Sequence, residues 1–324
     1  MSISRRKFLE TTAAGAIAAS SLSAKEGSGM PTRALGKTGV HVSILAMGTG
    51  SRFLQYKEED KAIEAIHKGL DLGITYIDSA DDYGKEHLSE KRIGNALQGR
   101  RDSVFIATKL SNRDPEKSFE IVEASLKALQ TDHLDLLHIH ALMKEDDLAK
   151  IEAKGGVLDQ VLKMRDQKMT RFIGITSHYD PTTLKTALER HDFDCTQMAL
   201  NGALTGMTNG KGGMVPNDAI KTSFETLALP VANRKNMGVI AMKVMAQDAL
   251  IGPAEPSKLM YYSLSLPITA VVIGMPKFEH IEENCRWAKA FKPLPMSERK
   301  KLSDELSAKY KAQLDHFFSH HVDA

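Results

Sequence analysis

Several features that would place a chain in a familiar class are scarce or missing in this sequence. Only two of the 324 residues are cysteines, Cys195 and Cys285, and their spacing fits neither a metal-binding nor a redox motif. We therefore expect two buried thiols and no metal site. No run of eighteen or more apolar residues is present, so no membrane span is predicted.

An excess of charge of one sign is also lacking. Basic and acidic residues number 43 and 41, so the formal net charge is only +2. No stretch combines clustered basic residues with interleaved aromatic residues, and nucleic acid is therefore not an expected partner. The composition, 42% hydrophobic and 26% charged, is that of an ordinary globular protein with a sizeable core. Length alone allows two domains or one α/β barrel with insertions.

The N-terminus departs from this ordinary pattern. The stretch "SRRKFLE" contains adjacent Arg5 and Arg6, and a short Ala-rich apolar stretch follows it and ends at Ala24. A charged start, a short apolar middle and small residues at a cleavage site define an export signal. The paired arginines resemble a twin-arginine (Tat) signal, so residues 1–24 are predicted to be a Tat signal peptide. The alternatives are a basic tail without a targeting role, or an inefficient signal on a cytoplasmic protein.

A Tat signal has consequences for location and partners. We expect the Tat export machinery as a partner and a periplasmic or exported location. The Tat route exports folded proteins, so a chain that needs a cofactor would carry it along, tightly held.

From about residue 41 the chain alternates between short apolar runs and amphipathic stretches. The apolar runs are "VSILAMG", "ITYIDSA", "VFIATKL", "LDLLHIHAL", "RFIGITS", "CTQMALN", "GVIAMKVM" and "AVVIGM". Repeated strand–helix units predict a parallel sheet, and strands that are apolar throughout are typical of a sheet buried on both faces. Eight units in about 250 residues favour a closed (β/α)8 TIM barrel, a fold of the α/β class.

Further segments complete the predicted architecture. The barrel is assigned to residues 32–293, and "RALGKTGVHVS" predicts an N-terminal β-hairpin that covers the barrel floor. Residues 294–324 are predicted to form an extra C-terminal helix and a tail. Ser89 is a candidate N-cap for the helix that follows it. The Gly-rich stretch 201–218 is predicted to be a loop over one face of the barrel, because its glycines lack phosphate-binding spacing.

Four titratable residues lie at the predicted ends of three neighbouring strands. Asp78 lies near the end of the second strand and Tyr83 just beyond it, Lys109 ends the third, and His140 ends the fourth. The active site of such a barrel lies at the C-terminal ends of its strands. A lone lysine there is commonly a surface residue and a lone histidine a core residue. Four such groups on one rim predict a site.

The chemistry of these four groups is coherent. Lys109 on an apolar strand needs a counter-ion, which Asp78 on the neighbouring strand can supply. An ammonium group beside a phenol stabilises the phenolate, so Tyr83 can serve as a general acid near neutral pH. His140 can hydrogen-bond and orient a substrate oxygen. The set suits protonation of a carbonyl oxygen while hydride reaches the carbon, and the expected hydride donor is a nicotinamide.

The same segments resemble a known family. "IDSADDYG", "VFIATK" and "LDLLHIH" are similar to the three signature segments of the aldo-keto reductase family, which uses a (β/α)8 barrel and an Asp–Tyr–Lys–His tetrad. The resemblance covers residues 32–291. His138 is out of register with the family's histidine and is interpreted as a core residue or a support for the site. The catalytic tetrad implied by the resemblance is Asp78, Tyr83, Lys109 and His140.

The resemblance also implies a cofactor site. Met242 stands where many members stack a tyrosine on the nicotinamide, and Gly274 and His280 stand where NADPH-preferring members place Lys and Arg. Family habit favours NADP, with NAD as the alternative, and the implied substrate is a small-molecule carbonyl or alcohol. The implied cofactor-binding residues are Thr176, Ser177, Gln197, Met242, Lys243, Gly274, Lys277, Glu283 and Asn284.

Three functions remain open from the sequence. The first is a nicotinamide-dependent oxidoreductase that interconverts carbonyls, sugars among them, and alcohols. The second is a cofactor-binding, redox-sensing module with little turnover. The third is a barrel hydrolase or lyase with Asp78 and His140 as acid and base, which would leave Gln197 and the segment "EEN" without a role.

Overall fold

The computed structural model describes residues 29–206, 222–319 and 321. The predicted Tat signal peptide, most of the Gly-rich stretch 201–218 and part of the C-terminal tail lie outside these residues. Within the described part, no helix is both long enough and apolar enough to cross a bilayer.

Eight parallel strands close into a barrel, as the sequence predicted. The strand order around the barrel is β10-β3-β4-β5-β6-β7-β8-β9, so neighbours in sequence are neighbours in space. Short apolar runs form these strands because both of their faces are buried, one inside the barrel and one under the helices. The strands are β3 (Leu45–Gly48), β4 (Tyr76–Asp78), β5 (Phe105–Leu110), β6 (Leu134–Ile139), β7 (Thr170–Ser177), β8 (Cys195–Ala199), β9 (Gly238–Met242) and β10 (Ala270–Gly274).

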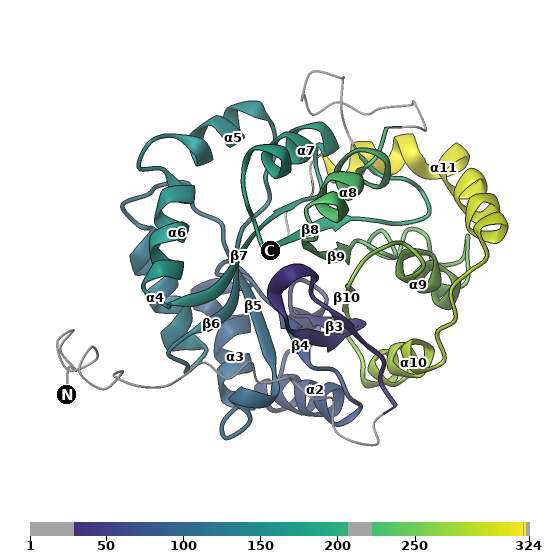
Figure 1. The fold of residues 1–324 in the computed structure, drawn as a ribbon. Coiled ribbons are helices and arrows are strands. Elements are labelled where there is room, and N and C mark those ends of the chain that lie inside the picture. The colour runs from purple at the N-terminus through teal and green to yellow at the C-terminus, as the bar shows by residue number, and fades with distance from the viewer. Residues whose placement is uncertain (1–28, 207–221, 320, 322–324) are drawn as a thin grey trace.

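Helices surround the strands as an outer ring (Figure 1). Short 3-10 turns lie in the connections, at η1 (Gly36–Thr38), η2 (Phe53–Gln55), η3 (Lys85–His87) and η4 (Arg101–Ser103). The ring helices are α2 (Glu59–Asp71), α3 (Leu88–Ala96), α4 (Ser118–Ala128), α5 (Glu145–Glu152), α6 (Val157–Asp166), α7 (Pro181–Arg190), α8 (Phe224–Arg234), α9 (Pro256–Leu264) and α10 (Phe278–Lys289).

A hairpin closes the floor of the barrel, which confirms the prediction for this segment. Its strands β1 (Thr32–Ala34) and β2 (His41–Ser43) pair in antiparallel fashion. Leu35, Val40 and Val42 are buried and join Tyr76 and Phe105 of the barrel interior in one apolar cluster. This plug seals the N-terminal end of the barrel, so a ligand reaches the interior from the opposite rim.

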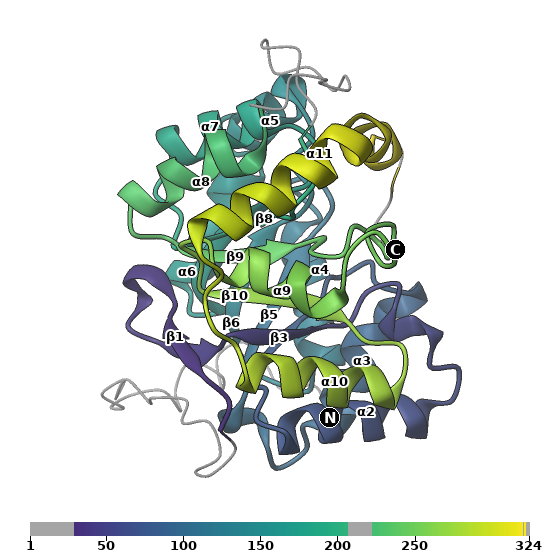
Figure 2. The same ribbon diagram turned by 90° about the vertical axis from the view of Figure 1, so that its right-hand side faces the viewer.

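The extra C-terminal helix, α11 (Met296–Phe318), lies on the outside of the barrel (Figure 2). Its apolar residues Leu306, Leu314 and Phe318 pack with Leu250 and with Leu259 of α9. Most of its other positions are polar, as expected for a helix with one buried face. The predicted helix after the barrel is therefore present and docks beside the loops that follow β8 and β9.

One local prediction from the sequence is wrong. Ser89 lies inside α3, which begins at Leu88, and does not cap the helix. Its hydroxyl donates to the carbonyl of Thr49 at 2.9 Å and lies 3.1 Å from the Ser79 hydroxyl. These two contacts hold Ser89 against the barrel, because a buried hydroxyl needs a hydrogen-bond partner.

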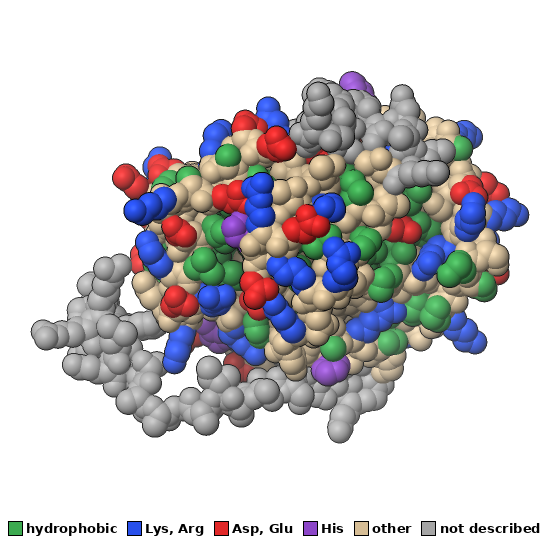
Figure 3. Space-filling view, turned by 45° about the horizontal axis from the view of Figure 1, so that its top comes forward, with side chains coloured by type: hydrophobic (Ala, Val, Ile, Leu, Met, Phe, Trp, Pro, Cys, Tyr) green, Lys and Arg blue, Asp and Glu red, His purple; other side chains and the backbone are tan. Residues whose placement is uncertain are grey.

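The surface carries both signs of charge. Figure 3 shows Lys, Arg, Asp and Glu side chains interspersed over one face, with no patch of a single sign among the side chains it colours. This pattern agrees with the small net charge of the whole chain.

Candidate active site

The polar residues predicted from strand ends gather at the C-terminal rim of β4, β5 and β6. Asp78 ends β4, Lys109 is the penultimate residue of β5, and His140 directly follows β6. In the parallel register, Asp78 pairs with Ala107 and Lys109 pairs with His138. Because alternate residues of a strand face the same side, Asp78, Lys109 and His138 all project into the barrel.

The ammonium group of Lys109 is the centre of the cluster. Its Nζ donates to Oδ2 of Asp78 at 2.7 Å, to the carbonyl oxygen of Ser79 at 2.6 Å and to Oη of Tyr83 at 3.3 Å. It also lies 4.8 Å from the centre of the Tyr83 ring. A primary ammonium has three donors, and each has an acceptor here.

This cluster is almost completely shielded from water. Lys109 and Asp78 are each 2% exposed, and Tyr83 is 7% exposed. A buried charge is tolerated when a partner and hydrogen bonds compensate it, and the Lys109–Asp78 ion pair supplies both. The structure therefore holds a cation beside a phenol in a site with little competing solvent.

His140 approaches Tyr83 from the neighbouring strand. The two rings meet edge to face, with centroids 5.9 Å apart. Nδ1 of His140 lies 2.7 Å from Oγ of Ser111 and 3.6 Å from Oδ1 of Asp82. The His140 side chain is buried. Its contact with Tyr83 links it to Lys109 and, through Lys109, to Asp78. Tyr83, Lys109, Asp78 and His140 thus form one contiguous group.

His138 lies deeper in the barrel, below this group. It is fully buried, and Gly174 leaves room for its ring, since a Cβ at that position would lie 2.4 Å from Nδ1 of His138. Burial, followed by the nearby charges of Lys109 and His140, lowers the pKa of His138 well below its usual value. It is therefore neutral and acts as a core residue beneath the site.

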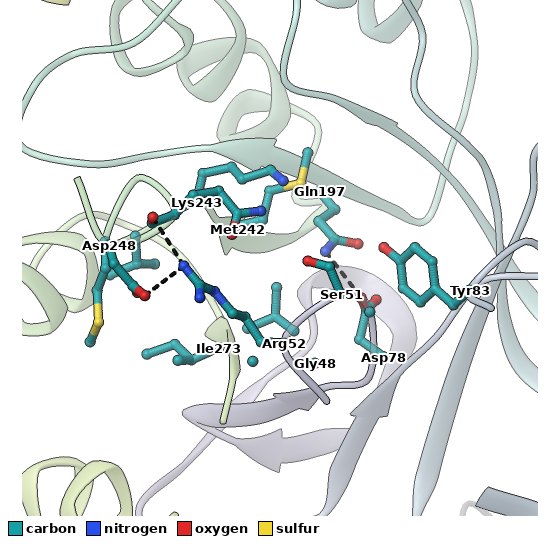
Figure 4. Close-up of a pocket in the computed structure, with 16 residues that line it drawn as sticks. Gly48, Ser51, Arg52, Asp78, Tyr83, Gln197, Met242, Lys243, Asp248 and Ile273 are labelled. Atoms are coloured by element: carbon teal, nitrogen blue, oxygen red, sulfur yellow. Dashed lines mark hydrogen bonds and ion pairs between the residues drawn. The ribbon is translucent and has the colours of Figure 1, made fainter. Parts of the chain in front are cut away.

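A cavity opens beside the cluster. It holds about 740 Å³ of empty space, solvent at its mouth included, and lies between the ends of β3, β4, β8, β9 and β10. Figure 4 shows Tyr83 and Asp78 at one end, Arg52 and Asp248 at the other, and Gln197 and Met242 between them. The phenol of Tyr83 therefore faces a space large enough for an organic ligand.

Four of the predicted cofactor-binding residues line this cavity: Gln197, Met242, Lys243 and Gly274. Gln197 donates from Nε2 to Oδ2 of Asp78 at 3.3 Å. Among the described residues, nothing donates to the buried Oε1 of Gln197. This carbonyl oxygen is an acceptor that a ligand can use.

The other predicted cofactor-binding residues lie elsewhere. The hydroxyl of Thr176 accepts a hydrogen bond from the Ala141 amide at 2.8 Å, and that of Ser177 donates to the Leu142 carbonyl at 2.7 Å. Both hydroxyls thus bind the loop after β6, and neither residue is part of the cavity wall. Three more residues lie at or in α10 and outside the wall: Lys277, Glu283 and Asn284.

Arg52 is a cavity residue that the sequence analysis missed. Its guanidinium pairs with Asp248 at 2.5 Å and donates to the carbonyl of Gln247 at 3.1 Å, which joins the loop after β3 to the loop after β9. A Cβ at Gly274 would lie 2.7 Å from Cβ of Arg52. Arg52 can therefore place its cation at the cavity because Gly274 has no side chain. The sequence alone does not show this contact, since it depends on how the two segments pack.

Two acids, Asp81 and Glu90, lie close to the tetrad. Burial raises the pKa of Asp81 to about 6, although hydrogen bonds from Ser111 oppose the shift. Its neighbour Glu90 is fully buried and bonds Nδ1 of His87 at 2.6 Å and the Thr108 hydroxyl at 2.6 Å. The hydrogen bond to Glu90 raises the pKa of His87. Asp81 and His87, which lie beside the tetrad, therefore both have raised pKa values.

No group of three or more His, Cys, Asp or Glu side chains within residues 29–206 and 222–319 is arranged to hold a metal ion. Both cysteines are buried free thiols, and burial raises the pKa of Cys285 to about 12. The described residues therefore contain neither a metal-binding cluster nor a disulfide.

Comparison with known proteins agrees with this fold. The L-galactose dehydrogenase of Arabidopsis thaliana is 28% identical over 302 residues, which cover 78% of this chain and 86% of that protein. An uncharacterized oxidoreductase of Bacillus subtilis, YqkF, is 25% identical over 304 residues, or 81% of this chain and 92% of the relative. The crystal structure of an aldo-keto reductase from Klebsiella pneumoniae in complex with NADPH superposes with a TM-score of 0.66 at 20% identity, covering 87% of this chain and 97% of that one.

The likeness to the solved structure shows the fold. The match to a family model shows which protein family the chain belongs to. The model described as "Aldo/keto reductase family" matches residues 44–258, which is more than half of the chain and includes Asp78, Tyr83, Lys109 and His140. The protein therefore belongs to the aldo/keto reductase family, whose enzymes are NAD(P)-dependent oxidoreductases.

Proposed function

We propose that the protein interconverts a carbonyl compound and an alcohol, with Tyr83 as the group that gives and takes the proton on oxygen. The observation that carries the proposal is the placement of Tyr83 Oη at 3.3 Å from the Lys109 ammonium, at the end of an open cavity. A phenol in this position can be a general acid, because the adjacent cation stabilises the phenolate that remains.

Each member of the tetrad has a role in this proposal. Asp78 holds the Lys109 ammonium in place through the 2.7 Å ion pair. Lys109 stabilises the Tyr83 phenolate after a carbonyl oxygen takes the proton, and the same phenolate accepts a proton from an alcohol in the reverse direction. His140, edge to face with Tyr83, orients the substrate oxygen by hydrogen bonding.

In this proposal the cavity holds a nicotinamide dinucleotide. When bound, this cofactor supplies or removes the hydride on the substrate carbon. Oε1 of Gln197, an acceptor with no donor among the described residues, suits the amide hydrogens of the nicotinamide carboxamide. At the far end of the cavity, Arg52 and Lys243 provide cations for phosphate groups, and Met242 lines the wall between.

NADP is the cofactor that we propose, with NAD as the alternative. Arg52 supplies a planar cation next to Gly274, where the sequence lacks one, and guanidinium groups bind phosphate oxygens in pairs. A similar fold has been solved with NADPH bound. Titration with NADP and NAD, followed by protein fluorescence, ranks the two directly.

Replacement of Tyr83 by phenylalanine tests the proposed function. The ring keeps its packing and loses only the hydroxyl, so we expect kcat for carbonyl reduction to fall by about 10²- to 10⁴-fold. Cofactor affinity should change little. Tyr76→Phe is the matched control, because Tyr76 is a buried barrel tyrosine whose hydroxyl has no partner among the described residues. A Tyr83→Phe enzyme with unchanged turnover would refute the assignment.

The same experiment separates an enzyme from a redox-sensing module. A module binds cofactor tightly and shows negligible turnover in the wild type, so Tyr83→Phe would have no activity to remove. Because one relative is named an L-galactose dehydrogenase, the substrate panel should contain aldose sugars together with short aldehydes and ketones. Absorbance of NADPH and NADH at equal concentrations is the readout.

We also propose export through the Tat route, on the basis of the Arg5–Arg6 pair and the short Ala-rich apolar stretch that follows it. The expected location is the periplasm, with the cofactor bound before export. Replacement of both arginines by lysine should retain the protein in the cytoplasm, and mass spectrometry of exported wild-type protein should detect cofactor. Equal partition of the two forms between fractions would contradict the proposal.

A further inference from the structure

The loop that follows β9 forms one wall of the cavity. Residues 243–248, here called the β9 loop, contribute to its lining Lys243, Val244, Met245, Gln247 and Asp248. Asp248 and the carbonyl of Gln247 also bind the guanidinium of Arg52 (Figure 4). The position of this loop therefore decides where the cations of the cavity lie.

The backbone of the β9 loop is strained. Four of its residues have a φ between 49° and 72°, namely Lys243, Ala246, Gln247 and Asp248. No residue of the loop is glycine, and residues with a Cβ disfavour this left-handed region. Such a backbone persists where the surrounding structure imposes it. Contacts from outside the loop are therefore needed to hold it.

Hydrogen bonds within the loop close tight turns. The amide of Ala246 donates to the carbonyl of Lys243 at 2.8 Å, and the amide of Leu250 donates to the carbonyl of Met245 at 3.3 Å. These bonds join near neighbours in the chain. They fix the turns but do not tie the loop to the rest of the barrel.

One outside contact comes from the segment after β8. Asn201 is 1% exposed, and its Nδ2 donates to the carbonyl of Lys243 at 3.0 Å. Its Oδ1 accepts the amide of Ala203 at 3.1 Å, so this side chain is itself fixed. The first residue of the β9 loop is therefore anchored to the neighbouring strand's loop.

Other contacts come from the C-terminal end of the chain. Phe318, the last residue of α11, is buried and shares one apolar cluster with Ala246. Its ring lies 5.7 Å from Nζ of Lys243. Nε2 of His321 lies 3.0 Å from Nε2 of Gln247. Phe318 and His321, here called the C-terminal brace, thus adjoin the strained part of the loop.

The brace is held by the rim of the barrel. The backbone carbonyl of His321 accepts the hydroxyl of Tyr179, which lies just after β7, at 2.8 Å. The His321 ring stacks on Phe317 with centroids 5.4 Å apart and meets Phe318 edge to face at 6.0 Å. The chain end is therefore fixed on one side to β7 and contacts the β9 loop on the other.

We propose that the C-terminal brace holds the β9 loop in its strained conformation and thereby sets how tightly the cavity retains a dinucleotide. The inference deepens the proposed function, because it rests on the cavity being the cofactor site. Phe318 and His321 are positioning residues, since they act through Lys243 and Gln247 and not on the ligand.

Replacement of His321 by alanine tests the brace. The change removes the contact with Gln247 and spares the hydrophobic core. The dissociation constant for NADP, followed by protein fluorescence, should rise by about tenfold, which corresponds to a loop that keeps its cavity-facing conformation for about a tenth of the time. His316→Ala is the matched control, because His316 is an exposed histidine of α11, and it should bind NADP as the wild type does.

A double-mutant cycle shows whether His321 acts through Gln247. Gln247 lines the cavity, so Gln247→Ala should weaken NADP binding by itself. Once Gln247 is alanine, His321→Ala should add little further loss, because its partner in the loop is already gone.

Amide hydrogen exchange of the cofactor-free protein gives a readout without any ligand. Peptides that span residues 243–251 should exchange at least about tenfold faster in His321→Ala than in the wild type or His316→Ala, because the loop opens more often. Peptides from β4 and β5 and the urea midpoint should not change. This pattern separates a brace from a general loss of stability.

Several results would overturn the inference. They are an unchanged dissociation constant in His321→Ala, equal weakening in His316→Ala, additive effects in the cycle, or equal exchange of residues 243–251 in the three proteins. A wild-type protein that binds neither NADP nor NAD would instead overturn the proposed function and the effect of the brace on binding. The exchange experiment would then still show whether the brace holds the loop.

Discussion

Replacement of Lys109 by methionine addresses how the cation at the centre of the site is held. Methionine has a similar length and no charge, so the change removes the ammonium and little packing volume. It leaves the Asp78 carboxylate 2% exposed, with the Gln197 amide as a remaining donor at 3.3 Å. An uncompensated buried charge is the largest electrostatic cost available to a folded protein.

The magnitude follows from the distance in the pair. At 2.7 Å, two unit charges attract by about 6 kcal/mol if the effective dielectric constant is about 20. Desolvation of both charges offsets most of this attraction, yet loss of one partner from a buried pair costs about 3–5 kcal/mol. We expect Lys109→Met and Asp78→Asn each to lower the free energy of unfolding by this amount. The double variant should be more stable than the sum of the two changes predicts, by about 2–3 kcal/mol.

Urea unfolding measures all four corners of this double-mutant cycle. The single tryptophan, Trp287, lies in α10 against the main hydrophobic core, so its fluorescence follows loss of the barrel. Lys311 and Asp315 of α11 form a matched control pair, also buried, at 2.9 Å. Lys311→Met and Asp315→Asn should show a similar coupling energy and leave the chemical step unchanged, whereas Lys109→Met should also abolish carbonyl reduction.

Additive effects would refute this reasoning. If the double variant Asp78→Asn/Lys109→Met loses the sum of the single losses within about 0.5 kcal/mol, the two charges do not stabilise one another. Full activity in Lys109→Met would show that no cation is needed beside Tyr83.

Three further predictions concern other parts of the molecule. Arg52→Ala should weaken NADP binding by at least about tenfold, because an arginine–phosphate contact is lost. Lys277→Ala changes an exposed residue outside the cavity wall and should leave NADP affinity unchanged. Equal loss of affinity in the two titrations would contradict the cavity assignment. Asp81→Asn should stabilise the protein at pH 7.5 by up to about 3 kcal/mol, because a carboxyl whose pKa rises from 3.8 to about 6 on folding is penalised when ionised. This penalty is present above pH 6 and fades as the pH falls toward 4, so thermal melts of the two proteins should converge in acid; a constant difference would be inconsistent with it. Cys195 and Cys285 are buried thiols, and burial raises the pKa of each. A thiol reagent at pH 8 should therefore react with neither cysteine in the native protein and with both in urea. Rapid reaction before unfolding would contradict the described packing.

Much of the fold could be predicted from the sequence because its pattern is local and repetitive. Eight apolar runs separated by amphipathic stretches can bury all of their apolar faces only as a sheet covered by helices. Asp78, Lys109 and His140 could be placed at one rim for the same reason, because parallel strands end on the same side. The position of a residue at a strand end is thus a property of the sequence pattern alone.

Other parts of the site depend on contacts between distant segments. Arg52 reaches the cavity because Gly274, more than two hundred residues away, has no side chain in its path. Oγ of Ser111 lies 2.7 Å from Nδ1 of His140, a residue on the next strand. Ala141, which follows His140, has a left-handed backbone with φ of 49° and donates its amide to Thr176 of the strand beyond. No composition or periodicity encodes such geometry.

Ser89 shows the same limit in an element that was correctly predicted as a helix. Its local sequence favours a capping role, but burial against Thr49 and Ser79 requires its hydroxyl inside the barrel wall. The sequence by itself therefore determined the barrel, its rim and the four groups that the rim carries. The tertiary structure alone decided which hydroxyl, carboxyl and guanidinium groups surround them, because these contacts join residues that only close packing brings together.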